Sequence, residues 1–148
     1  MPSKRVVDFY NLNSFVVIGV SRTRRNSGWA VFEELSKLGK QVYPVNSQGG
    51  SRNGIELFRR LEDLPEAPQG AVLCTKPKEI SGILDSLKKT GVKYLWLHLG
   101  TYNLEVLKKS ESLGFDPIKG CAIMYNPKAA GIHKFHRALN NLFGKGYK

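Results

Sequence analysis

The chain has 148 residues, of which 41% are hydrophobic and 24% charged, and its formal net charge is +11. This length predicts a single domain over residues 1–148. No apolar run approaches the roughly 20 residues of a membrane span, and the first ten residues lack the apolar core of a signal peptide. We therefore expect a cytoplasmic protein without a membrane partner, whose charge favours an anionic ligand.

Predicted strands and helices alternate along the chain. A continuous apolar run over residues 14–20 predicts a buried parallel strand, and apolar side chains at helical spacing from Trp29 to Leu38 predict a helix. A second strand is predicted over residues 41–45, and a short extended piece over residues 55–58 after a loop. The later predictions are strands over 71–74, 94–97 and 120–124 and helices over 77–91, 104–114 and 131–143.

This alternation is typical of a parallel sheet with helices on both sides. It predicts an α/β fold, a Rossmann-like three-layer sandwich with a mostly parallel sheet of about five strands. Ligands of such sheets lie beyond the carboxyl ends of the strands, at the point where the strand order reverses. The loops after Val20, Val45, Cys74 and Leu97 would reach that point.

The most informative segment joins the first predicted strand to the first predicted helix. The strand breaks at Gly19, a loop with three arginines follows, and a helix begins near Gly28. Such a turn presents backbone N–H groups and the positive end of a helix dipole to an anion. The predicted phosphate site therefore comprises Gly19, Val20, Ser21, Arg22, Arg24, Arg25, Ser27 and Gly28. The alternative is an ordinary loop whose arginines are solvated.

Two positions bear on which nucleotide this site would take. The dinucleotide fingerprint G-x-G-x-x-G is not met, because Ser21 stands where the second glycine would be. Asn46 occupies the place after the second strand where an acidic residue would bind the ribose of NAD. With Arg52 nearby, Asn46 would tolerate a phosphorylated ribose, as in coenzyme A or NADP.

Five short motifs resemble those of small stand-alone CoA-binding proteins, whose domain is similar to the N-terminal domain of the succinyl-CoA synthetase alpha subunit. Together they extend over roughly residues 12–125. In chain order they are Val17-Ile18-Gly19-Val20-Ser21, Val42-Tyr43-Pro44-Val45-Asn46, Leu61-Glu62-Asp63-Leu64-Pro65, Trp96-Leu97-His98-Leu99-Gly100, and Cys121.

The resemblance implies a protein that binds coenzyme A without catalysing a reaction. It places the loop after Gly19 at the phosphates and Asn46 beside the adenosine. His98 and Gly100 would belong to the far wall, although His98 stands where the family usually has glutamine. The segment that would line the path of the nucleotide or pantetheine comprises Cys74, Thr75, Lys76 and Pro77.

Other functions remain as alternatives. His98 follows a strand and could be the acid–base group of an NADP- or other nucleotide-dependent enzyme. We expect a hydrogen-bonding role instead, because no serine or cysteine partner can be assigned to it. No nucleic-acid partner is expected, since no helix-turn-helix domain accompanies the predicted fold. His133 and His136 lack further ligands, so no metal site is expected, and the oligomeric state is left open.

Overall fold

The computed structural model describes residues 3–122 of the chain. The predicted helix over 131–143, with its two histidines, lies outside these residues. In chain order the elements are α1 (Lys4–Tyr10), β1 (Ser14–Ile18), α2 (Ser27–Lys37), β2 (Gln41–Val45), β3 (Ser51–Arg52), β4 (Ile55–Glu56), η1 (Leu61–Asp63, a 3-10 turn), β5 (Gly70–Leu73), α3 (Pro77–Thr90), β6 (Tyr94–Leu97), α4 (Leu104–Ser112) and β7 (Ile118–Lys119). No helix among the described residues is long and apolar enough to cross a membrane.

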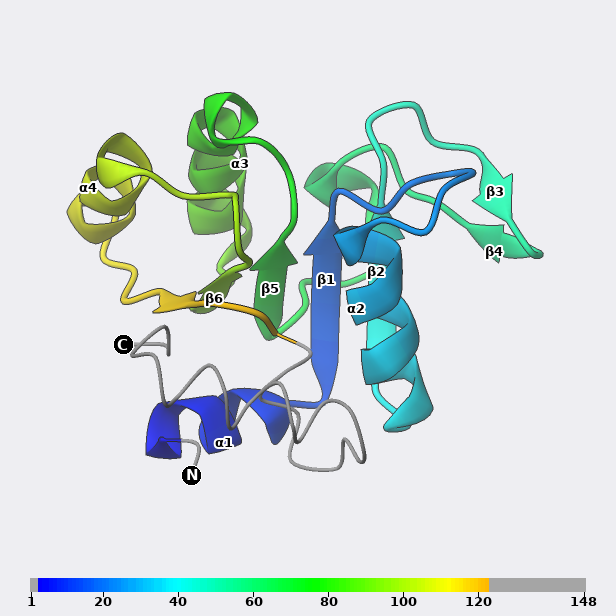
Figure 1. Ribbon diagram of the computed structural model, residues 1–148, viewed down its shortest axis with the longest axis horizontal. Coiled ribbons are helices and arrows are strands. Elements are labelled where there is room, and N and C mark those ends of the chain that lie inside the picture. The colour runs from blue at the N-terminus through cyan, green and yellow to red at the C-terminus, as the bar shows by residue number, and fades with distance from the viewer. Residues whose placement is uncertain (1–2, 123–148) are drawn as a thin grey trace.

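Five parallel strands form the main sheet, in the order β2-β1-β5-β6-β7 (Figure 1). The chain moves outward from β1 to β2 and then returns to the other side of β1 to form β5. The strand order therefore reverses between β1 and β5. The predicted α/β fold, Rossmann-like with a parallel sheet of about five strands, is confirmed.

Helices cover both faces of this sheet, which explains the continuous apolar run of β1. Successive side chains of a strand point to opposite faces. Phe15 and Val17 pack in one core with side chains of α1 and α2, whereas Val16 and Ile18 pack in the other with side chains of α3 and α4. Each face of β1 is thus buried, as expected for a central parallel strand.

Helix α1 was not predicted, although it closes one end of the core. Its side chains Val6, Phe9 and Tyr10 are buried, and the ring of Phe9 lies 5.3 Å from the rings of both Phe15 and Trp96. A seven-residue helix is too short to be stable on its own. Its formation depends on this aromatic packing, which the sequence pattern does not display.

The last strand was predicted over residues 120–124 and instead lies at Ile118–Lys119. Gly120 has a φ of 130°, a backbone conformation that takes the chain out of the strand. The Gly120 N–H donates to Leu97 O, and the indole N–H of Trp96 donates to Gly120 O. Residues 120–122 therefore cross against the end of β6, which places them beside His98.

The region predicted as a loop and an extended piece contains a small hairpin. Strands β3 and β4 pair antiparallel, and Arg52 lies opposite Ile55. The connection is Asn53-Gly54, with both residues at positive φ, as the type I′ turn of two-residue hairpins requires. After the hairpin, Phe58 returns to the end of β2 by a bridge to Val45. This path brings Arg52 alongside the loop that follows β1.

Candidate functional site

A cleft of about 870 Å³ opens at the carboxyl ends of the parallel strands, where the strand order reverses. Its size falls within the usual range for small-molecule sites. Many of the predicted site residues line it, and they come from four different loops. These residues are Gly19, Val20, Ser21, Arg22, Arg24, Asn46, Cys74, Thr75, Lys76 and Gly100.

Five predicted residues do not line the cleft. Arg25 turns back along α2, where its guanidinium lies 3.1 Å from the carboxylate of Glu33. Ser27 and Gly28 form the start of α2 behind the loop. Pro77 lies in a second, smaller cavity of about 540 Å³ between α3 and α4. His98 is buried and is described below.

The structure adds lining residues that sequence reasoning missed. Arg59 and Arg60 immediately precede one of the motifs quoted above, which was the available signal for this segment. Helix α3 also contributes, at positions from Lys78 to Ser86. The principal additions are Gln48, Arg59, Arg60, Glu62, Lys78, Glu79, Gly82, Ile83, Ser86, Leu99 and Thr101.

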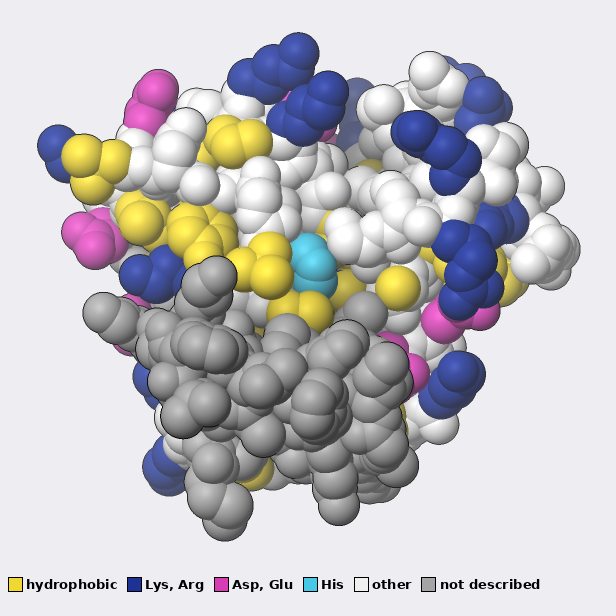
Figure 2. Space-filling view, in the orientation of Figure 1, with side chains coloured by type: hydrophobic (Ala, Val, Ile, Leu, Met, Phe, Trp, Pro, Cys, Tyr) yellow, Lys and Arg dark blue, Asp and Glu magenta, His cyan; other side chains and the backbone are white. Residues whose placement is uncertain are grey.

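The cleft is strongly basic. Six cationic side chains line it against two carboxylates, Glu62 and Glu79. In Figure 2, Lys and Arg side chains gather along the upper edge, above the strand ends of Figure 1. A concave surface of one charge sign attracts ligands of the opposite sign. The six cationic residues are Arg22, Arg24, Arg59, Arg60, Lys76 and Lys78.

The loop after β1 is held by hydrogen bonds between its own residues and by one from the end of β2. The side-chain oxygen of Asn26 accepts from the N–H groups of Ser21 and Trp29, at 3.2 and 2.9 Å. The Ser21 hydroxyl accepts from the N–H groups of Thr23 and Arg24. From the end of β2, the Asn46 amide donates to Val20 O at 2.8 Å. Asn46 thus shapes the loop as well as lining the cleft.

These hydrogen bonds change which donors the loop offers to an anion. The N–H groups of Gly19 and Val20 both donate to Val45 O, and three further N–H groups are used within the loop as just described. These five N–H groups are therefore already used within the protein. Among the side chains of the loop, Arg22 and Arg24 are the exposed cationic donors that line the cleft.

Two residues at the end of β5 sit deep in this region. Burial raises the pKa of the Cys74 thiol to about 12, and a hydrogen bond with Ser27 offsets only part of that effect. Cys74 is therefore a neutral thiol at physiological pH. The neighbouring Thr75 hydroxyl is a buried polar atom without a hydrogen-bond partner among residues 3–122.

His98 follows β6 but turns into the protein. Its side chain is only 6% exposed, and its Nδ1 accepts a hydrogen bond from the Ala122 N–H at 3.3 Å. Burial lowers the pKa of His98 to about 4. The imidazole is therefore neutral at physiological pH, and it joins β6 to the crossing segment of residues 120–122.

A parallel sheet of this order, with a cleft at its switch point, defines the class of Rossmann-like α/β domains. Within that class, a family model described as "CoA binding domain" matches residues 13–127. The chain belongs to this family. The predicted resemblance to CoA-binding domains is thereby confirmed.

Two curated relatives are ligases of which this chain covers a part. The chain is 27% identical over 143 residues to an ADP-forming acetate–CoA ligase of Methanocaldococcus jannaschii, covering 89% of this chain and 19% of the ligase. It is 25% identical over 139 residues to the alpha subunit of ADP-forming acetate–CoA ligase II of Pyrococcus furiosus, covering 91% of this chain and 30% of that subunit.

Solved structures share the fold at lower identity. A hypothetical protein from Pyrococcus horikoshii OT3 superposes with a TM-score of 0.76 at 23% identity, covering 84% of this chain and 89% of that chain. The dinucleotide-forming acetyl-coenzyme A synthetase 1 of Ca. Korarchaeum cryptofilum, in complex with phosphate and ADP, gives a TM-score of 0.66 at 20% identity. That alignment covers 84% of this chain and 32% of the synthetase.

Proposed function

We propose that this protein binds coenzyme A in the cleft at the carboxyl edge of the sheet. The proposal rests on the charge of the cleft in a chain of the CoA-binding family. Six cationic side chains line it against two carboxylates. Coenzyme A carries a diphosphate and a ribose 3′-phosphate, so its nucleotide end matches this charge. Arg22 and Arg24 would contact the phosphates through charge-assisted hydrogen bonds.

The remainder of the cleft suits the rest of the ligand. Gly82 and Ile83 of α3 and Leu99 after β6 give this part of the lining a small and apolar character. Leu99 is 50% exposed and lines the cleft, so it offers apolar surface to a ligand there. We place the uncharged pantetheine arm against these residues, with the nucleotide end at the basic loop.

The geometry supports binding without chemistry on the ligand. His98 lies outside the cleft lining, and its Nδ1 is already hydrogen-bonded to the Ala122 N–H. The Cys74 thiol does line the cleft, but its raised pKa keeps it protonated and weakly nucleophilic. An acid–base role for His98 in an NADP-dependent enzyme therefore has no support from its position.

Coenzyme A should stabilise the protein against thermal unfolding far more than NAD does. The reason is the absence of a ribose-binding carboxylate at Asn46 together with the basic lining. At 100 times its Kd, a ligand adds about 2.7 kcal/mol of stability. Thermal-shift titrations with coenzyme A, NADP and NAD measure this order, and equal or stronger stabilisation by NAD would contradict the proposed ligand.

The neighbouring arginines of the loop should contribute unequally to binding. Arg24→Ala should weaken coenzyme A binding by about 1.5–3 kcal/mol, the range for a hydrogen bond to a charged group. Arg25→Ala is the matched control and should change it by less than about 0.5 kcal/mol, because Arg25 pairs with Glu33 away from the cleft. Calorimetry measures the coenzyme A affinity of both variants. Equal losses of affinity in the two would contradict the assignment of the phosphate contact to Arg24.

A further inference from the structure

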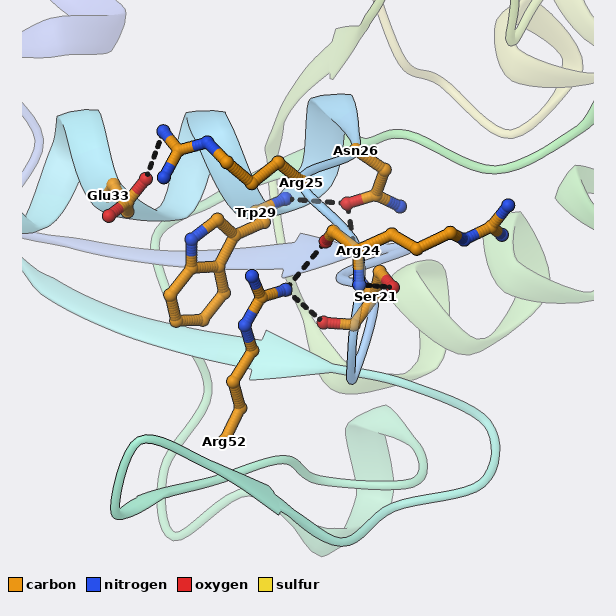
Figure 3. Close-up of polar contacts among 7 residues, drawn as sticks. All are labelled: Ser21, Arg24, Arg25, Asn26, Trp29, Glu33 and Arg52. Atoms are coloured by element: carbon orange, nitrogen blue, oxygen red, sulfur yellow. Dashed lines mark hydrogen bonds and ion pairs between the residues drawn. The ribbon is translucent and has the colours of Figure 1, made fainter.

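Arg52 makes an unusual set of contacts beside the cleft. Its Nη1 donates to two backbone carbonyls of the loop after β1, to Ser21 O at 2.9 Å and to Arg24 O at 2.6 Å. The guanidinium carbon also lies 3.8 Å from the centroid of the Trp29 ring, at the start of α2 (Figure 3). The sequence placed Arg52 near a ribose phosphate, but the residue does not line the cleft.

We propose that Arg52 is a positioning residue that holds the loop of residues 21–26, hereafter the arginine loop, in its ligand-binding conformation. The inference rests on the proposed function, because the ligand it would serve is coenzyme A. One guanidinium nitrogen joins carbonyls three residues apart, so it fixes the curvature of the loop between them. The arginine that acts on the ligand and the arginine that shapes the loop are thus different residues.

The Arg24 side chain and the Arg24 carbonyl lie on different sides of the loop. The carbonyl accepts from Arg52, as does that of Ser21. Figure 3 shows the Arg24 side chain extending away from Arg52, and Arg25 turning along α2 toward Glu33. Without the contact, nothing in the described residues ties the Arg24 carbonyl to the hairpin.

The partners of Arg52 are neutral, which preserves the charge of the site. Arg52 forms no ion pair with a carboxylate among residues 3–122. Carbonyl dipoles and the face of Trp29 stabilise its charge instead. A carboxylate at this place would hold the guanidinium equally well, but it would also cancel positive charge beside a site for an anion.

Backbone hydrogen bonds connect the hairpin segment that contains Arg52 to the main sheet. The Phe58 N–H donates to Pro44 O at 2.9 Å, and the Asn46 N–H donates to Phe58 O at 2.8 Å. These hydrogen bonds anchor the segment after the hairpin to the end of β2, which itself belongs to the main sheet. The position of Arg52 is therefore set by the sheet, and the position of the arginine loop is set in turn by Arg52.

Two substitutions separate the geometry of Arg52 from its charge. Arg52→Gln removes the charge. Arg52→Lys keeps the charge but loses the planar group that stacks on Trp29, and its ammonium is one bond shorter than the Nη1 that reaches both carbonyls. The matched control is Lys93→Gln, which removes one exposed charge just before β6, at the opposite edge of the sheet. The affinity for coenzyme A is measured by calorimetry for wild type and the three variants.

We expect both Arg52 variants to weaken coenzyme A binding about tenfold and Lys93→Gln to leave it within twofold. The two Arg52 variants should lose affinity to a similar extent, because both lose the guanidinium geometry that holds the loop while only one loses the charge. Full binding by Arg52→Lys would overturn the proposal, since charge alone would then suffice. A much larger loss in Arg52→Gln than in Arg52→Lys would overturn it also, as it would indicate that the charge of Arg52 acts on the ligand directly.

Trypsin provides a second readout that needs no ligand, because Arg22, Arg24 and Arg25 are all cleavage sites. In the free protein, both Arg52 variants should be cut in the arginine loop about tenfold faster than wild type and Lys93→Gln. Unchanged cleavage would overturn the proposal. Faster cleavage with unchanged coenzyme A affinity would overturn it too, by reducing Arg52 to a structural role. A wild type that binds no coenzyme A would instead contradict the proposed function, while the cleavage rates still report on the contact.

Discussion

Gly28→Ala should lower the free energy of unfolding by about 3 kcal/mol, the upper part of the usual range for overpacking. A Cβ at this position would lie 2.3 Å from Gly19 O and 3.0 Å from the Val20 Cα. Both contacts are with backbone, which cannot rotate away as a flexible side chain would. The start of α2 therefore packs on the turn after β1 as closely as a glycine allows, and urea unfolding measures the cost of filling that contact.

Gly82→Ala is the matched control for this substitution. Gly82 lies inside α3, and a Cβ there would meet nothing within 4 Å. Alanine is favoured over glycine in a helix interior, so Gly82→Ala should raise the free energy of unfolding by about 1 kcal/mol. Equal effects of the two substitutions would show that the close approach of α2 to Gly19 is not a constraint on the fold.

The stability of the protein should depend on pH through His98. Burial lowers the pKa of His98 to about 4 in the folded protein, from 6.5 in the unfolded chain. The folded state thus binds fewer protons than the unfolded state between these values. The stability that neutral His98 gives the folded state is fully present above pH 6.5. It is lost as the pH falls toward 4, which lowers the free energy of unfolding by about 3 kcal/mol in total.

His98→Gln isolates this contribution from other titrating groups. Glutamine can accept a hydrogen bond from the Ala122 N–H but does not titrate. The difference in unfolding free energy between wild type and His98→Gln should therefore shift by about 3 kcal/mol between pH 6.5 and pH 4. Parallel stability curves for the two proteins would show that His98 is not buried as described. We expect coenzyme A affinity at neutral pH to be unchanged, because His98 lies outside the cleft lining.

Much of the fold followed from the sequence because the central strands are buried on both faces. The predicted ranges 41–45 and 94–97 coincide with β2 and β6, and Gly91 ends α3 in the left-handed conformation as expected. Elements stabilised by distant contacts were missed or displaced. Helix α1 depends on aromatic side chains from β1 and β6, and the end of β7 depends on hydrogen bonds from Gly120 to β6.

The candidate site shows the same division. Residues directly after the ends of β1, β2 and β5 line the cleft, since parallel strands present their carboxyl ends at one edge. His98 also follows a strand, but it is buried, and its Nδ1 accepts a hydrogen bond from the Ala122 N–H. The contact of Arg52 with the arginine loop depends on the hairpin, whose packing against that loop has no local signal in the sequence.

The most direct test of a coenzyme A site in this cleft is a titration of the wild-type protein followed through its backbone amide NMR signals. We expect saturable shifts that are largest in the loops after β1, β2 and β5, at residues such as Ser21, Asn46 and Thr75. Lys93, at the opposite edge of the sheet, should not shift. Saturable shifts centred instead between α3 and α4, or no saturable shifts at all, would contradict a coenzyme A site at the switch point.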